Sequence, residues 1–488
     1  MAFGQCDCCK FPRPCSSEST VEFFANLRDA IEDANPNAGT PASSASTTQM
    51  VYLDFEIGED RTAENEYTPA QRMEIKEMLE DQFRRFDVSF SLSFPTGEFS
   101  TLVFNEDASS GPGQIFNPPR TRIGGSAEGV DFRNLNRSDI AIVFVNEPNL
   151  SGPQLVTASA NVAAHELGHL LGLRHADALG PIGTGISNEF APSFVPAFEG
   201  PLDGAIEAEN HIMGNGFPFN FENSFFTERL NWFSERSSAR LVVAEGHQTV
   251  IDMDGNDTIA DAQPMELLNQ VVPNTIEEGG IVGGVLIEPV NAGTGDFCGA
   301  IAVVEGSLNG SDNDPVDIFR IEGRAGDILN LQVLSSRLPR LCSNSIDPTI
   351  SVTDAAEVLL DYHGVDAFNE DGVDAIEFAR FGDAELVDLT LTSDGPIFVQ
   401  VGLSDRNPSE SGNYELLVYR FGAVDAEGRL PTSTLGDVDL SGVVDFSDIP
   451  AFIGVLQSGV FQAEADCDCS TVVDFADIPA FIAILQAQ

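Results

Sequence analysis

Hydrophobic and polar residues follow three successive patterns along the chain. Between residues 49 and 240, apolar runs of strand length alternate with segments whose apolar residues recur at helical spacing. From about residue 245 to 425, short alternating strands are separated by Gly and Asp turns. After residue 433, two similar segments each end in a short apolar helix. The chain is therefore predicted to be multidomain, with an α/β (α+β) domain, an all-β sandwich and a small α-helical module.

The domain boundaries are placed where the composition changes. We expect a Cys-rich segment and a linker of small polar residues over 1–48, the α/β domain over 49–240, the sandwich over 241–425 and the C-terminal module over 433–488. A chain of 488 residues is too long for a single hydrophobic core, which agrees with this division.

Within the α/β domain we expect strands and helices in a mixed order. Thr68, Pro69 and Gln71 have the residue types of the N-cap, N1 and N3 positions of a helix. The buried face of that helix is expected to contain Met73, Ile75, Met78, Leu79, Phe83 and Phe86. The strands are expected at 50–57, 88–94, 100–105 and 139–146. A second helix is predicted from about 157 to 171, and a closing helix over 225–238.

The segment from His165 to His175 contains the most specific chemical pattern. His165 and His169 are four residues apart, so on a helix they project from one face and can bind the same metal ion. Gly172 is expected to adopt a left-handed conformation, end the helix and let His175 supply a third nitrogen. Glu166 then lies beside the metal without being a ligand. Three histidines leave a fourth position for water, as a catalytic Zn²⁺ requires.

The spacing HExxHxxGxxH resembles that of the metzincin zinc endopeptidases, and Met213 lies in a segment that resembles their Met-turn. The resemblance implies one catalytic Zn²⁺, Glu166 as the general base toward its water, and an edge strand that binds the substrate as an added β-strand. His211 is interpreted as a neighbour of the site, because the ligand set is complete without it. Asn215 occupies the position of an extra Tyr ligand in some branches, so three protein ligands plus water are expected.

The predicted sandwich contains turn–strand phrases such as Asp317–Ile321 and Gly412–Leu416, which resemble a pre-peptidase C-terminal domain. Such a domain is appended to secreted peptidases. Two interpretations stay open, namely binding of a substrate or surface, and a stabilising or secretion-related appendage.

The C-terminal module contains a twelve-residue calcium-loop pattern twice. The ligand positions of the first copy are Asp437, Asp439, Ser441, Val443 through its carbonyl, Asp445 and Asp448. Those of the second copy are Asp466, Asp468, Ser470, Val472 through its carbonyl, Asp474 and Asp477. Thr471 replaces the turn residue Gly442 of the first copy, which predicts a weaker second site. The module resembles dockerin repeats, which implies two Ca²⁺ ions and a cohesin-like or cell-surface partner.

Composition excludes some partners and favours an extracellular location. The formal net charge is −53, and Lys10 and Lys76 are the only lysines, so nucleic acid is not expected to bind. No apolar run reaches 18 residues, so no membrane span is expected. Ala2-Phe3-Gly4 is similar to the end of a signal-peptide cleavage site, so we expect a secretion signal upstream.

The eight cysteines favour disulfides in that compartment. Cys298 and Cys342 are the expected pair. The four cysteines among the first fifteen residues leave a second hypothesis open, in which a thiolate caps the zinc in a latent form.

The sequence as a whole predicts a secreted, zinc-dependent endopeptidase that acts on a protein or peptide substrate. The alternative is a calcium-stabilised extracellular adhesion or scaffold protein, docked through its C-terminal module, with an inactive or latent peptidase domain.

Overall fold

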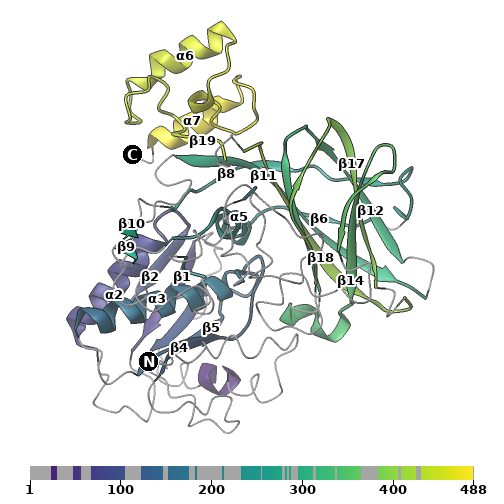
Figure 1. Cartoon of the computed structure of the whole chain (residues 1–488). Helices are drawn as coiled ribbons and strands as arrows, with labels where there is room; N and C mark the ends of the chain where they lie inside the picture. Colours follow the sequence, from purple (N-terminus) through teal and green to yellow (C-terminus); the bar gives the residue numbers. More distant parts are fainter. Residues whose placement is uncertain are drawn as a thin grey trace.

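The protein consists of several β-sheets and a few helices, which form a helix-covered sheet, a β-sandwich and a helical C-terminal module (Figure 1). The computed structural model describes residues 24–29, 48–55, 67–104, 122–146, 152–174, 182–183, 211–213, 232–253, 255–276, 281–282, 285–286, 295–311, 315–335, 338–363, 383–404, 408–424 and 430–486.

The first sheet has five strands in the order β2-β1-β3-β5-β4. Their bounds are β1 (Gln49–Asp54), β2 (Val88–Ser91), β3 (Ser100–Phe104), β4 (Arg122–Ala127) and β5 (Ile140–Asn146). Strands β1, β2, β3 and β5 run parallel, whereas β4 is antiparallel to β5 and forms an edge. Four strands match the predicted ones within a few residues. Strand β4 was not predicted, because its central Gly124 and Gly125 are residues that weaken strands.

Two helices, α2 (Pro69–Gln82) and α3 (Pro153–Leu170), pack against each other on one face of this sheet. Helix α2 begins as predicted, with a reciprocal capping box between Thr68 and Gln71. The prediction that Met73 is buried was wrong, since its side chain is 47% exposed. At 100° per residue Met73 lies opposite Met78 and Leu79, which are buried.

Alternating residues of the sheet serve two apolar cores. Leu102, Ala141 and Val143 face α2 and α3 in the main core. Val103 and Ile142 face the opposite side, where Phe24, Leu27 and Ile140 join them. Phe24 and Leu27 belong to the helical residues 24–29, so the sheet is covered on both faces.

A sandwich of two mainly antiparallel sheets follows, in which β6–β11 and β7–β12 are parallel pairs. The larger sheet has the path β16-β13-β18-β11-β19, with β6 and β8 also paired to β11, and the smaller has the order β15-β14-β17-β12-β7. The strands of the larger sheet are β6 (Thr249–Ile251), β8 (Leu268–Val272), β11 (Asp296–Asn309), β13 (Ile328–Leu334), β16 (Ala384–Thr390), β18 (Ser411–Phe421) and β19 (Thr432–Ser433). Those of the smaller are β7 (Gln263–Pro264), β12 (Val316–Gly323), β14 (Pro348–Asp354), β15 (Leu359–His363) and β17 (Gly395–Leu403). A shared apolar core, which includes Val333 and Val399, holds the two sheets together. A separate hairpin is formed by β9 (Ile281–Val282) and β10 (Val285–Leu286).

Helix α5 (Glu235–Ala244) lies between the five-stranded sheet and the sandwich (Figure 1). It begins ten residues later than the predicted helix, because Ser234 caps it with its side chain. The preceding part of the prediction, 225–231, lies outside the described residues. Ala239 and Val243 of α5 share an apolar core with sandwich residues such as Ile301. The two parts of the molecule are therefore joined by a hydrophobic interface.

The C-terminal module consists of α6 (Asp448–Ser458), α7 (Asp477–Gln486) and the loops before them. The equivalent residues Phe452 and Phe481 stack with their ring centroids 4.1 Å apart. Strand β19 pairs with the start of β11, and a disulfide joins Cys298 of β11 to Cys469. The expected partner Cys342 was therefore wrong. The β19–β11 pairing brings the distant module beside Cys298, and no local pattern signals such a contact.

Candidate metal centres

His165 and His169 lie together on the last turns of α3. Both side chains are buried, with 6% exposed, and the two ring centroids are 4.9 Å apart with an interplanar angle of 89°. This is the arrangement expected for residues four apart on a helix. The helix therefore brings two imidazoles to one place inside the protein.

Backbone carbonyls determine which ring nitrogen of each histidine carries the proton. His165 Nδ1 lies 2.8 Å from the carbonyl of Ile212, and His169 Nδ1 lies 2.9 Å from the carbonyl of Leu173. A carbonyl only accepts, so Nδ1 is the donor in both rings and Nε2 carries the lone pair. Second-shell bonds of this kind orient metal-binding histidines, so the pair fits a Zn²⁺ ion.

The chain reverses directly after α3. Leu173 N–H donates to Gly168 O and Gly172 N–H donates to His169 O, which together form a Schellman motif. Gly172 has φ +88°, and a Cβ there would lie 2.7 Å from Phe132 Cα. Only glycine fits both conditions. The predicted third ligand, His175, lies outside the described residues.

Met213 lies beneath the helix. It is fully buried, and a Cβ on Gly168 would lie 2.3 Å from the Met213 sulfur, so the thioether contacts α3 beside His169. The neighbouring His211 accepts a hydrogen bond from Met213 N–H at Nδ1, and its Nε2 lies next to the N–H of Ser234. His211 thus braces the backbone of this turn, as its interpretation as a neighbour requires.

Glu166 is completely buried between α3 and the edge strand β4. A Cβ on Gly125 of β4 would lie 2.4 Å from Glu166 Cγ, so the strand needs glycine at this position. Burial raises the pKa of the Glu166 carboxyl well above its usual range, and a backbone hydrogen bond from Ala127 opposes the rise. The weak strand signal of β4 is therefore a consequence of how closely β4 approaches Glu166.

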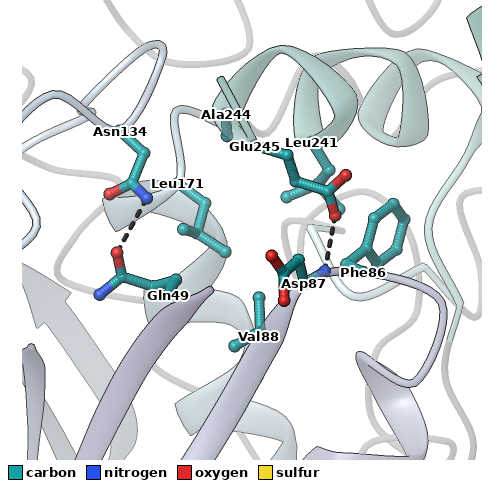
Figure 2. Close-up of a pocket in the computed structure, with 9 residues that line it drawn as sticks. All are labelled: Gln49, Phe86, Asp87, Val88, Asn134, Leu171, Leu241, Ala244 and Glu245. Carbon is teal, nitrogen blue, oxygen red and sulfur yellow. Dashed lines mark hydrogen bonds between the residues drawn. The ribbon is translucent and has the colours of Figure 1, made fainter. Parts of the chain in front are cut away.

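A small pocket lies behind the end of α3, away from the histidine pair. Figure 2 shows Leu171 and Asn134 at one side, and Leu241 of α5 and the C-cap residue Glu245 at the other. Glu245 Oε1 accepts a hydrogen bond of 2.6 Å from Asp87 N–H. The pocket lacks a histidine and marks the seam between α3 and α5.

The structure brings together the carboxylates at positions 1, 3 and 12 of each predicted calcium loop. Carboxylate oxygens lie within 4.8 Å of one another in each of the groups Asp437, Asp439, Asp448 and Asp466, Asp468, Asp477. In the second group, burial raises the pKa of Asp466 to about 6, and the charges of Asp477 and Asp468 act in the same direction. A bound cation would relieve this repulsion. Asp445 and Asp474 belong to neither group.

The second loop has a conformation that its side chains do not favour. Cys469 has φ +56° and Thr471 has φ +70°. Two contacts hold these residues against the sandwich, namely the disulfide to Cys298 and a 2.8 Å hydrogen bond from Arg324 to Thr471 Oγ1. The first loop has the same left-handed backbone at Leu440, which is equivalent to Cys469, with φ +59°. It differs at the position of Thr471, where Gly442 has φ +83° and glycine needs no such support.

No protein-family model and no curated protein matches this chain. Among solved structures, it is similar to the pre-peptidase C-terminal domain of collagenase from Bacillus anthracis (18% identity, 24% of this chain and 86% of that chain, TM-score 0.17). A periplasmic inhibitor of g-type lysozyme, PliG from Salmonella Typhimurium, covers 25% of this chain and 90% of its own at 12% identity and TM-score 0.16. Myroilysin covers 41% of this chain and 73% of its own at 15% identity and TM-score 0.17. Likeness at this level carries no argument about activity.

Replacing Gly172 with Ala is expected to lower the free energy of unfolding by ~1–3 kcal/mol, because the new Cβ adds a contact with Phe132 to a strained φ. Urea unfolding measures the loss. Gly246→Ala is the matched control, since Gly246 also has a positive φ but nothing within 4 Å of a Cβ. Equal losses in the two variants would contradict the steric role of Gly172.

Replacing Cys298 with Ser is expected to lower the Ca²⁺ affinity of the second loop by about tenfold, or ~1.4 kcal/mol, while the first loop is unchanged. The reason is that the disulfide holds the second loop two residues before Thr471, whose left-handed backbone is glycine in the first loop. Calorimetric Ca²⁺ titrations measure each loop in a background where the other is disabled, by Asp448→Ala or Asp477→Ala. An equal fall in both loops would instead indicate general destabilisation.

Proposed function

We propose that this protein is a zinc-dependent endopeptidase. The observation that carries the proposal is the pair of bonds from Nδ1 of His165 and His169 to backbone carbonyls, which orients both rings so that Nε2 is the nitrogen that would bind a metal ion. Glu166 follows His165 directly on the same helix, as the HExxH pattern requires. We assign His175 as the third ligand, because it follows the Gly172 turn at the expected distance along the chain.

Zn²⁺, when bound, lowers the pKa of water toward ~7 and polarises the scissile carbonyl. The Glu166 carboxylate takes the proton of the attacking water and delivers it to the leaving amine. Burial raises the pKa of the Glu166 carboxyl, which strengthens it as a proton acceptor. The hydrogen bond from Ala127 keeps the carboxyl in place beside β4.

Strand β4 is the proposed guide for the substrate. It pairs only with β5 among the described strands, and it lies directly over Glu166 through Gly125. A peptide added antiparallel or parallel to this edge would run past the catalytic base with its backbone fixed by main-chain hydrogen bonds. The substrate is therefore an extended protein segment, bound mainly through its backbone.

The C-terminal module is proposed to bind two Ca²⁺ ions and to dock on a cohesin-like or cell-surface partner. Equivalent apolar side chains of the two copies are exposed to the same extent, at 78% for Phe446 and 79% for Phe475. Exposed apolar side chains mark a binding site when they form a contiguous patch, which is the arrangement proposed for this module. This favours an attachment function beside peptidase activity, and it is also what the adhesion or scaffold alternative would use.

We infer an extracellular or cell-surface location from the disulfide, the acidic surface and the calcium loops together. No helix in the described part of the chain is long and apolar enough to cross a membrane.

Replacing Glu166 with Gln is expected to lower the rate of casein hydrolysis by about 10³-fold or more while leaving one Zn²⁺ per chain, because the amide cannot accept the proton but does not touch the ligands. Metal analysis and proteolysis on the same preparations, with Ca²⁺ present throughout, check both parts.

The variant Glu80→Gln is the control, since Glu80 lies on α2 beside Lys76 and far along the chain from the metal helix. Hydrolysis that survives in Glu166→Gln would remove Glu166 from the reaction. If wild type and Glu166→Gln both bind zinc and neither hydrolyses casein, the scaffold alternative would be favoured.

A further inference from the structure

The turn that ends α3 is held by side chains from outside the five-stranded sheet. Arg240 of α5 donates to Gly172 O from Nε at 3.1 Å and from Nη2 at 2.9 Å. Its remaining Nη1 donates to the amide oxygen of Gln332 on β13 of the sandwich. Arg240 is buried and also lies 5.2 Å above the Phe132 ring. The turn is thus tied to the sandwich through α5.

A second connection reaches the same turn two residues later. The guanidinium of Arg174 binds both carboxylate oxygens of Glu385 on β16, at 3.0 and 3.1 Å. The two side chains are only 4% and 11% exposed, so solvent screens this pair weakly. Parallel N–H···O bonds of this kind fix geometry as well as distance. The ion pair therefore sets where the backbone of residue 174 lies.

The two connections close into a ring. Gln332 Nε2 donates to Glu385 Oε2 at 3.4 Å, so Gly172, Arg240, Gln332, Glu385 and Arg174 are linked in sequence. Leu173 lies between Gly172 and Arg174, the two residues that these contacts hold.

Leu173 matters because its carbonyl receives the Nδ1–H of His169. With residue 172 tied through Arg240 and residue 174 tied through Glu385, the Leu173 carbonyl has little freedom to rotate. That carbonyl fixes the tautomer and the ring plane of a proposed zinc ligand. The sandwich therefore reaches the proposed metal site by two routes, from Gln332 through Arg240 and from Glu385 through Arg174, which meet at the Leu173 carbonyl.

The segment that follows the Gly172 turn also contacts strand β16. Asp388 of β16 accepts a 2.8 Å hydrogen bond from Gly183 N–H and a 2.8 Å ion-pair bond from Arg236 of α5. A Cβ on Gly183 would lie 2.7 Å from Val424 Cγ1, so the chain lies directly on the sandwich here. Strand β16 thus contacts the chain at positions 174 and 183.

We propose that the β-sandwich helps to position the zinc site. In this proposal Glu385 and Arg174 are positioning residues for His169. The inference rests on the proposed zinc-binding function and extends it. The sandwich would then affect the geometry of the zinc ligands, which neither a separate binding domain nor a stabilising appendage would do. Its consequence is that zinc affinity depends on a carboxylate that belongs to another sheet.

The test compares Zn²⁺ affinity, measured by competition with a chromogenic chelator, in wild type, Glu385→Gln and Arg174→Lys. Loss of a second-shell partner is expected to weaken zinc binding about 10- to 100-fold. Both variants are close in size to the native side chains, and circular dichroism verifies that they are folded. The visible spectrum of the Co²⁺-substituted protein is expected to shift in both, because it reports the geometry of the ligands.

Asp296→Asn is the matched control. Asp296 of β11 also forms an ion pair with the other part of the molecule, at 2.7 Å from Arg85, but it does not belong to the ring. Its zinc affinity and Co²⁺ spectrum are expected to match wild type.

Unchanged affinity in Glu385→Gln would overturn the inference and leave the proposed function intact. An equal loss in Asp296→Asn would overturn it as well, since general docking of the two parts would then explain the effect. A wild-type chain that binds no zinc would remove the proposed function, and the inference with it.

Discussion

The turn at Gly172 is the constraint on which the site depends. A helix that carries two metal ligands must end at once if a third ligand is to approach from outside, and here the Schellman motif ends it within one residue of Leu171. Because Gly172 N–H donates to His169 O and Leu173 O accepts from His169 Nδ1, both the backbone and the ring of His169 are bound into the same turn. Any shift of this turn would therefore also move the ring of His169, a proposed metal ligand.

Cationic side chains are few in this acidic chain, and several of the arginines are buried at one interface. The chain has 24 Lys and Arg against 77 Asp and Glu, yet Arg174, Arg236 and Arg240 are all buried where α3 and α5 meet the sandwich. Each is satisfied by oxygens of Glu385, Asp388 or Gln332. Buried ion pairs contribute little net stability, because desolvation offsets most of their attraction. We infer that they make the docking of the two parts specific. A misaligned interface would bury unpaired charges, which costs considerable free energy.

Sequence reasoning succeeded where the signal is local. The cap of α2 at Thr68 and the end of α3 follow from residues a few positions apart, and the structure agrees with them, although α3 begins at Pro153, four residues before the predicted start. It failed where distant segments decide the outcome. Gly125 weakens the strand pattern of β4 because Glu166 needs the space, and Cys298 pairs with Cys469 because β19 brings the module to β11. The Arg174–Glu385 pair joins positions 211 apart along the chain, and neither residue has a local pattern that marks it.

The larger sheet of the sandwich connects the two proposed metal regions physically. At one end, β16 holds the Gly172 turn through Glu385, and at the other end β11 carries the disulfide to the second calcium loop. Strands β13 and β18 lie between them and each is hydrogen-bonded to its neighbours, with one register shift between β13 and β16 at Leu329–Leu331. A shared sheet does not by itself establish energetic coupling between the sites. It does fix the C-terminal module relative to the proposed peptidase site. If the proposed attachment and peptidase functions both hold, a partner bound to the module would keep the β4 edge at a defined position and select the substrates within its reach.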